Sequence, residues 1–582
     1  MKRFGSLNSI IYAFPSQLTS NSIEMKKTES FNFKFYEWER KFHDRPFLRQ
    51  PFGDQWEEYT WAETGQMARK LASGLKKMGL RENAHIGLIS KNCREWIIAD
   101  LAIMMAGYIS VPFFPSLKGE ELEFLLDYGD VDLLFVGKIE TWDQIKAHIP
   151  KDLPLIAFPQ YKGCSLVDKG EKWFDFINQN EPLQKPHVPK LSDIWTIIFT
   201  SGTTGNPKGV ELSFLALDET KIITEQVNPL KIDFSGNNDF ISYLPLNHIA
   251  ERVVVEHVCL RFGGTLSFVE SLETFAANLK DIQPHVFFAA PRIWTKFQQG
   301  ILAKIPQKKL NTLLSIPLIS SIIKRKIKKN LGLNRARSTV SGSAPLQLSV
   351  IEWFRKIDVF ITNGYGMTEN CAICTQVDGR DFEKLASVGK PQCGVEIKID
   401  PKNEEILMRG PFVMEGYYKN KKLTEKTLVD GWLRTGDKGR LDEDNYLYVT
   451  GRVADSFKTS KGKFIEPLTL EKYFGNIKEL EEVCVTGIGM PQPLALAQLS
   501  EIGKAMPREE LTSRLSQHLE EINQDLENYK KIATLVIVKE AWTEQNKILG
   551  PTLKIKRGNV EKMYNTNFKE WHEAPQTVLF EK

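Results

Sequence analysis

The chain has 582 residues and a mass of 66.5 kDa, which is more than one ordinary hydrophobic core organises, so two or more domains are expected. Apolar residues make up 42% and charged residues 26%, a composition typical of soluble globular proteins. The formal net charge of +4 is small for this length and argues against a dedicated nucleic-acid binder, which carries a concentrated basic face.

The first thirty residues differ from the rest of the chain. A short apolar stretch, Ile10–Phe14, is followed by polar residues up to Lys26, and no small-residue cleavage site is clear. Residues 1–30 are therefore interpreted either as a disordered leader or as the product of an upstream start, with Met25 as the true first residue. No apolar run reaches the length that spans a bilayer.

Residues 31–449 alternate between helical and strand patterns. Trp61–Leu80 predicts an amphipathic helix, because Leu71, Leu75 and Met78 recur at helical spacing. Strand–helix–strand alternation of this kind favours α/β layers with parallel strands. The elements expected next are a strand at 85–89, a helix at 95–106 and a short strand-like run at 111–115.

A change of pattern near Gly451 predicts a domain boundary. Residues 437–449 have the pattern of a turn-rich β segment, whereas later residues predict two strands and a helix. The expected organisation is a large N-terminal domain of layered α/β subdomains at 31–450 and a small α+β domain at 451–582. In the second domain the strands are expected at 483–488 and 534–538, and the apolar helix face comprises Leu511, Leu515, Leu519, Ile522 and Leu526.

The most informative segment is residues 196–210, T-I-I-F-T-S-G-T-T-G-N-P-K-G-V, in which an apolar strand runs into glycines, hydroxyls and a lysine. Glycines let backbone N–H groups converge on an anion, and the hydroxyls and the lysine add donors and charge. A Walker A loop is excluded because Lys208 is followed by Gly209 and not by Ser or Thr. The density of donors favours a polyphosphate-binding loop over a flexible surface turn. The residues expected to bind phosphate are Thr200, Ser201, Gly202, Thr203, Thr204, Gly205 and Lys208.

The loop S-G-T-T-G-N-P-K-G resembles the signature of the adenylate-forming superfamily, which includes acyl-CoA synthetases, luciferases and adenylation domains. Three further segments resemble that family in the same order along the chain. The resemblance covers about residues 31–564 and implies the adenylate-forming enzyme fold, with a mobile C-terminal domain. The segments are N-G-Y-G-M-T-E at 363–369, G-W-L-R-T-G-D at 431–437 and L-G-P-T-L-K-I-K-R at 549–557.

For ATP, the resemblance implies that Tyr365 stacks on adenine, Asp437 accepts both ribose hydroxyls and Arg452 reaches ribose or phosphate. Glu369, with Thr200, is implied to hold Mg²⁺, because a cation that bridges phosphates needs hard oxygen ligands. The same resemblance places seven further residues at the nucleotide: Ser343, Ala344, Asn363, Gly364, Gly366, Met367 and Thr368.

Lys554 matches the family's catalytic lysine, with Lys556 and Arg557 as neighbouring alternatives. The implied reaction has two steps: a carboxylate attacks the α-phosphate of ATP and pyrophosphate leaves, and then CoA takes the acyl group from acyl-AMP. Y-L-P-L-N-H-I-A-E-R at 243–252 resembles the acyl pocket of long-chain enzymes, so His248 is expected beside the carboxylate of a long-chain fatty acid.

The thiol tunnel is implied to include Lys458 and Gly462. Ala454 departs from the family, which often has Lys or Asp at this hinge position, and the switch is therefore left unexplained. Two alternatives stay open: an acyl-AMP ligase that loads a separate carrier protein, and a non-catalytic adenylate-binding relative. The joint presence of Lys208, Glu369 and Lys554 favours the enzyme.

Seven cysteines at irregular spacing favour reduced thiols and a cytoplasmic protein. Cys371 and Cys374 form a lone CxxC pair without further ligands at zinc spacing, and they are interpreted as buried small residues. Residues 310–330 combine apolar side chains with a basic end, so they fit either peripheral contact with an anionic membrane or an ordinary surface helix pair. Pro317 interrupts the pattern and favours the second interpretation.

Overall fold

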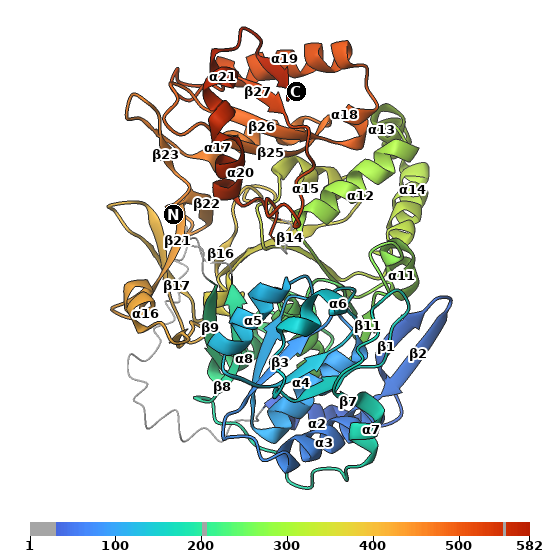
Figure 1. The fold of residues 1–582 in the computed structure, drawn as a ribbon. Coiled ribbons are helices and arrows are strands. Elements are labelled where there is room, and N and C mark those ends of the chain that lie inside the picture. Colours follow the sequence, from blue (N-terminus) through green and yellow to red (C-terminus); the bar gives the residue numbers. More distant parts are fainter. Residues whose placement is uncertain (1–30, 201–206, 551–553, 582) are drawn as a thin grey trace, which may run out of the picture.

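The computed structural model describes residues 31–200, 207–550 and 554–581 (Figure 1). The predicted leader at 1–30 lies outside the described residues. The described chain forms two large sheets with their helices, a smaller antiparallel sheet and a C-terminal α+β unit. Among the described helices, none combines the length and apolar composition needed to cross a membrane.

The first large sheet ends at the predicted phosphate loop. Its order is β19-β9-β8-β4-β3-β5-β6-β7, and the pairs β3–β4, β3–β5 and β4–β8 are parallel, as the alternating pattern predicted. The strands are β3 (His85–Ile89), β4 (Ile109–Phe113), β5 (Val131–Val136), β6 (Leu155–Ala157), β7 (Glu171–Lys172), β8 (Ile194–Thr200), β9 (Lys208–Ser213) and β19 (Gly416–Tyr417). The helices in this part are α3 (Trp61–Lys77), α4 (Arg94–Ala106), α5 (Gly119–Tyr128), α6 (Trp142–Ile145), α7 (Trp173–Asn178) and α8 (Phe214–Gln226).

The predicted helices near the N-terminus are confirmed, and their ends have local causes. Helix α3 begins at Trp61 because the Thr60 side chain accepts from the Glu63 amide while Glu63 accepts in return from the Thr60 amide, which is a capping box. Helix α4 ends at Gly107, whose left-handed φ of 76° suits a residue without Cβ. All thirteen residues of α4 are buried, so this helix belongs to the core.

The second large sheet has the order β16-β15-β14-β13-β12-β10-β11-β1-β2, with parallel pairing from β14 through β12. Its strands are β1 (Pro46–Phe52), β2 (Gln55–Thr60), β10 (Asp239–Ser242), β11 (Thr265–Phe268), β12 (Val286–Ala289), β13 (Ser338–Ser341), β14 (Ile361–Tyr365), β15 (Thr375–Val377) and β16 (Lys390–Pro391). The helices of this part are α2 (Phe31–Lys41), α9 (Ile249–Glu251), α10 (Val258–Phe262), α11 (Phe275–Ile282), α12 (Pro291–Lys304), α13 (Gln307–Ser315), α14 (Pro317–Asn330) and α15 (Leu348–Arg355).

Residues 310–330 fold as two helices and not as one interrupted segment. Pro317 is the first residue of α14, where its missing N–H costs no helical hydrogen bond. Figure 1 shows α12, α13 and α14 grouped on one side of the molecule.

The smaller sheet follows, and the C-terminal unit comes after it. The smaller sheet comprises β17 (Glu396–Ile399), β18 (Glu405–Arg409), β20 (Leu428–Val429), β21 (Trp432–Leu441) and β22 (Leu447–Arg452), with α16 (Lys421–Thr427). The C-terminal sheet comprises β25 (Leu480–Thr486), β26 (Leu494–Leu499), β27 (Leu535–Ile537) and β28 (Val578–Phe580). A hairpin of β23 (Phe457–Lys458) and β24 (Phe464–Ile465) and the helices α17 (Pro467–Glu471), α18 (Glu501–Lys504), α19 (Arg508–Gln524), α20 (Arg557–Tyr564) and α21 (Phe568–Glu573) complete it.

Two interpretations of the apolar residues can be compared with this fold. Leu511, Leu515 and Leu519 are buried on one face of α19, as predicted, whereas Leu526 lies beyond the end of the helix. Cys371 and Cys374 are both buried, and burial raises the pKa of the Cys371 thiol to about 12. The boundary at residue 451 stays a prediction.

Candidate active site

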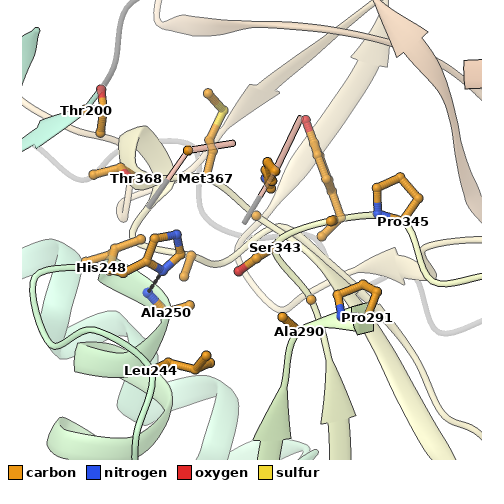
Figure 2. A pocket seen from close by; sticks show the side chains of 18 of the residues that line it. Thr200, Leu244, His248, Ala250, Ala290, Pro291, Ser343, Pro345, Met367 and Thr368 are labelled. Atoms are coloured by element: carbon orange, nitrogen blue, oxygen red, sulfur yellow. Dashed lines mark hydrogen bonds between the residues drawn. The ribbon is translucent and has the colours of Figure 1, made fainter. Parts of the chain in front are cut away.

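One large cleft is lined by residues from both large sheets, from β21 and β22, and from the C-terminal unit. Several parallel strands end at it, including β8, β12, β13 and β14, and carboxyl ends of parallel strands are where α/β folds bind ligands. Figure 2 shows Thr200, His248, Ser343, Met367 and Thr368 around one common space. The other predicted residues that line the cleft are Lys208, Ala344, Asn363, Gly364, Tyr365, Gly366, Glu369, Asp437, Arg452 and Lys554.

The predicted phosphate-binding region is marked by Thr200 and Lys208, which face each other in the β8–β9 ladder. Both residues line the cleft, so the two ends of the loop open into it. The Lys208 ammonium lies 5.3 Å from the centroid of the Tyr417 ring, within the range of a cation–π contact. The loop positions Ser201, Gly202, Thr203, Thr204 and Gly205 lie outside the described residues.

The predicted metal ligand Glu369 is buried on the 3₁₀ helix η3 (Thr368–Asn370) at the cleft wall. The Tyr417 hydroxyl donates to Glu369 Oε1 over 2.8 Å, which fixes the carboxylate against β19. Thr200 lines the same cleft as this fixed carboxylate. Together the two residues offer hard oxygen donors, which fit Mg²⁺. The sequence did not single out Tyr417, because it lies 48 positions away from Glu369.

The predicted ribose site is a carboxylate held by two donors. Tyr365 donates its hydroxyl to Asp437 Oδ2 over 2.7 Å, and Arg452 Nε lies 3.1 Å from Asp437 Oδ1. Asp437 and Arg452 are register partners in β21 and β22, so the sheet itself sets their pairing. Burial, with the neighbouring Asp437 charge, holds the Tyr365 pKa well above its usual value, so the phenol stays a donor. The carboxylate is therefore oriented before any nucleotide binds.

Lys554 projects into the cleft from the C-terminal unit. Its side chain keeps contact with solvent in the open cleft, yet protein atoms surround it on most sides. This desolvation, together with the positive charge of Arg452, lowers the Lys554 pKa from 10.5 to about 8, and Asp437 only partly opposes the shift. A fraction of the amino group is therefore neutral at mildly alkaline pH.

The neighbouring His248 is electrostatically coupled to Lys554. Burial and then the charge of Lys554 lower the His248 pKa to about 4, so the imidazole is neutral near pH 7. Its Nδ1 accepts a 3.3 Å hydrogen bond from the Ala250 amide, drawn as a dashed line in Figure 2. This contact caps the short helix α9 and holds the ring at the cleft surface.

The loop before His248 is clamped by Asn92, which follows β3. Asn92 Nδ2 donates to the Leu244 carbonyl over 2.7 Å, and the Leu246 amide donates to Asn92 Oδ1 over 3.2 Å. The buried Lys138 donates in turn to the carbonyl oxygens of Asn92 and Val269, which joins the segments that follow β3 of one large sheet and β11 of the other. Sequence reasoning missed Asn92 and Lys138, since neither lies in a recognisable motif.

A buried ion pair lies between the segment at 243–252, which resembles an acyl pocket, and β8, the strand that precedes the phosphate loop. Arg252, at the start of the π-helix η2 (Arg252–His257), donates to both oxygens of Asp100 over 2.7 Å and to the Thr196 hydroxyl over 2.8 Å. Both Arg252 and Asp100 are fully buried. Through these contacts the segment at 243–252 is joined to α4 and to β8, the strand that precedes the phosphate loop.

Two predicted tunnel residues are not brought to the cleft. Lys458 and Gly462 are exposed on the β23–β24 hairpin, outside the cleft lining. The Lys458 ammonium instead lies 4.9 Å from the Phe464 ring centroid. Ala454, the predicted hinge residue, does line the cleft.

Taken together, the fold and the cleft define the class of adenylate-forming enzymes. The family described as "AMP-binding enzyme" matches residues 35–418, and "AMP-binding enzyme C-terminal domain" matches residues 454–575. The chain therefore belongs to the AMP-binding enzyme family, and it is an acyl-activating enzyme of the AMP-forming acid–thiol ligase type.

Individual relatives are similar over most of the chain. "Long chain acyl-CoA synthetase 4" of Arabidopsis thaliana is 28% identical over 479 residues, covering 74% of this chain and 71% of the relative. "Long-chain-fatty-acid--CoA ligase ACSBG2" of Xenopus laevis is 26% identical over 620 residues, covering 93% and 84%. The solved anthranilate CoA ligase AuaEII with anthranoyl-AMP has a TM-score of 0.76 and 21% identity, over 92% of this chain and 97% of that one, which supports the fold alone.

Proposed function

We propose that the enzyme uses ATP to convert a long-chain fatty acid to acyl-AMP and then transfers the acyl group to CoA. The observation that carries this proposal is one cleft that joins Lys554, Glu369 and Asp437 with an apolar wall next to His248. The similarity to long-chain acyl-CoA synthetases supports the choice of acid.

In the first step the acid's carboxylate oxygen attacks the α-phosphorus, the acyl–phosphate bond forms and pyrophosphate leaves. Lys554 supplies positive charge to the α-phosphate oxygens, where negative charge grows. Asp437, already oriented by Tyr365 and Arg452, receives the ribose hydroxyls. Mg²⁺ held by Glu369 and Thr200 would neutralise phosphate charge, and Lys208 adds a cation at the loop.

The substrate needs no general base, because a fatty carboxylate is already ionised at neutral pH. A neutral His248 suits a position beside the substrate carboxylate. Its ring is polar but carries no charge that would compete with Lys554. Asn92 positions His248 indirectly by fixing the loop that precedes it.

The acyl chain is proposed to lie along the apolar wall beyond His248. Residues of helix α8, the following loop, η2 and α10 contribute this wall, and most of them are buried. A π-helix places its side chains out of α-helical phase, a feature common at functional sites. The wall residues are Ile223, Leu230, Val253, Val254 and Val258.

In the second step the CoA thiol loses its proton to solvent and its sulfur attacks the acyl carbonyl. The C–S bond forms, the acyl C–O bond to the phosphate breaks, and AMP leaves with that electron pair. Lys458 and Gly462 lie away from the cleft, so their proposed part in a thiol tunnel requires the C-terminal unit to turn. Ala454 offers little steric resistance to such a rotation.

The test is pyrophosphate release over fatty acids of increasing length, with and without CoA. We expect release to peak with long acids, and acyl-CoA to form when CoA is present. Val254→Phe should shift the optimum to shorter acids without changing the KM for ATP, whereas Val227→Phe, exposed and away from the cleft, should not. Release without acyl-CoA would favour the carrier-loading alternative, and no release with any acid would refute the proposal.

A further inference from the structure

The helix pair α13–α14 carries an unusual distribution of charge. Its sequence from Gln307 to Asn330 contains no acidic residue. Lys324 forms an ion pair with Asp358, with Nζ 2.9 Å from the carboxylate. The other basic residues give the helix pair its positive charge. They are Lys308, Lys309, Arg325, Lys326, Lys328 and Lys329.

Helix α14 packs into the core through one face only. Ser320 and Ile327 are buried, and Ile323 packs against the same core. The opposite face leaves large apolar side chains in solvent: Leu318 is 83% exposed and Ile322 is 66% exposed. Exposed apolar side chains that gather on one element commonly mark an interaction site.

The outward residues follow helical spacing. Leu318, Ile322, Arg325 and Lys329 recur at steps of four, three and four residues, so they form one stripe along the helix. The stripe is apolar at its N-terminal half and cationic at its C-terminal half. We define the α14 outer face as Leu318, Ile319, Ile322, Arg325, Lys326 and Lys329, together with Ile316 just before the helix, all of which are exposed.

We propose that the α14 outer face docks the enzyme onto an anionic lipid bilayer. Its apolar residues match the acyl boundary of the bilayer, and its cations match lipid phosphates at the same surface. The absence of any acidic residue within α13–α14 removes the repulsion that an anionic surface would otherwise meet.

The α14 outer face lies near the helix that lines the cleft. If the proposed function holds, docking through this face would place the cleft near its substrate. Helix α12 contributes Arg292, Lys296 and Gln299 to the cleft, and Phe297 and Ile301 of the same helix pack in the core shared with α13 and α14. Figure 1 shows α14 beside α12 and close to α11. Docking would therefore bring the cleft to the layer in which long-chain acids dissolve.

The experiment is co-sedimentation of the full chain with vesicles of phosphatidylcholine alone and of phosphatidylcholine with phosphatidylglycerol. We expect binding to the anionic vesicles that weakens at higher salt. Leu318→Ser/Ile322→Ser and Arg325→Gln/Lys326→Gln/Lys329→Gln should each lower the partition coefficient about ten-fold or more.

Matched control variants replace the same number of exposed apolar or basic side chains elsewhere on the molecule. The apolar control is Leu166→Ser/Val188→Ser, with side chains 62% and 68% exposed. The charge control is Lys402→Gln/Lys421→Gln/Lys422→Gln, three lysines exposed on another part of the molecule. Both control proteins should bind the anionic vesicles as the unmodified protein does.

Failure of the unmodified protein to bind anionic vesicles would overturn the proposal, as would outer-face variants that bind as tightly as the controls. Pyrophosphate release with a dispersed acid should be equal in all variants, which shows that they are folded. A protein without ligase activity that still binds vesicles through this face would refute the proposed function and leave the docking intact.

Discussion

The proposed role of Lys554 gives the mechanism a pH dependence whose direction follows from the lowered pKa of this lysine. Desolvation by the surrounding protein atoms and the charge of Arg452 lower its pKa to about 8, and in the proposed mechanism only the protonated form stabilises the α-phosphate. Raising the pH from 7 to 9 takes the charged fraction from about nine tenths to about one tenth. The kcat/KM for ATP in the adenylation half-reaction should therefore fall about ten-fold, since kcat/KM reports the free enzyme.

Substitutions of Lys554 separate the loss of its charge from other effects of high pH on the enzyme. Lys554→Arg keeps a cation across the whole range, so whatever rate remains should be nearly independent of pH between 7 and 9. Lys554→Ala should slow adenylation by about a hundred- to a thousand-fold. Lys556→Ala, two residues away, is the matched control and should leave the rate within a few-fold of the unmodified enzyme.

The assay is ATP–pyrophosphate exchange at each pH, alongside thioester formation from supplied acyl-adenylate. The second half-reaction should survive Lys554→Ala, because the proposed turn of the C-terminal unit moves Lys554 away before the thiol attacks. Equal loss of both half-reactions would mean that Lys554 has another role. A pH profile that stays flat in the unmodified enzyme would contradict the pKa argument directly.

Two further predictions concern ion pairs. Arg252→Met leaves the buried Asp100 carboxylate uncompensated, so urea unfolding should show a loss of about 3–5 kcal/mol, most of which the double variant Asp100→Leu/Arg252→Met should recover. A double variant as unstable as the single one would contradict this explanation. Arg292 Nη2 lies 2.6 Å from Glu481 Oε1 and links α12 to β25 of the unit that carries Lys554. Because loss of this pair loosens that link, Arg292→Ala should slow adenylation about five-fold without altering unfolding. Glu481→Gln should give the same loss and add nothing to it in the double variant; additive losses would show that the pair is not the cause.

The sequence predicted the parts of the site that depend on neighbouring residues. The strand before the phosphate loop is β8, and the segment containing Tyr365 is β14. The motif residues Asp437 and Arg452 turn out to be register partners because a short turn joins their strands. A local apolar pattern predicted the strand before the phosphate loop, whereas Tyr365, Asp437 and Arg452 were placed at the nucleotide by resemblance to the adenylate-forming superfamily.

The rest of the site depends on contacts between distant positions. Asn92 reaches Leu244 over 152 positions, and Arg252 reaches Asp100 over the same separation. A single sequence shows no periodicity or spacing that links such pairs, because packing between the two sheets creates them. The same reason explains α14: apolar and basic residues were visible in the sequence, but only the fold shows which of them remain in solvent.

The order of the cleft residues along the chain has a consequence for biosynthesis. The predicted nucleotide residues from Thr200 to Arg452 leave the ribosome well before Lys554, which lies close to the C-terminal end of the sequence given. A nascent chain that has emerged only as far as Arg452 would therefore contain the predicted ribose carboxylate, Asp437, before the predicted catalytic lysine is made. Lys554 would be the last of the predicted site residues to be synthesised, so the predicted nucleotide-binding residues and the predicted catalytic cation become available at different times.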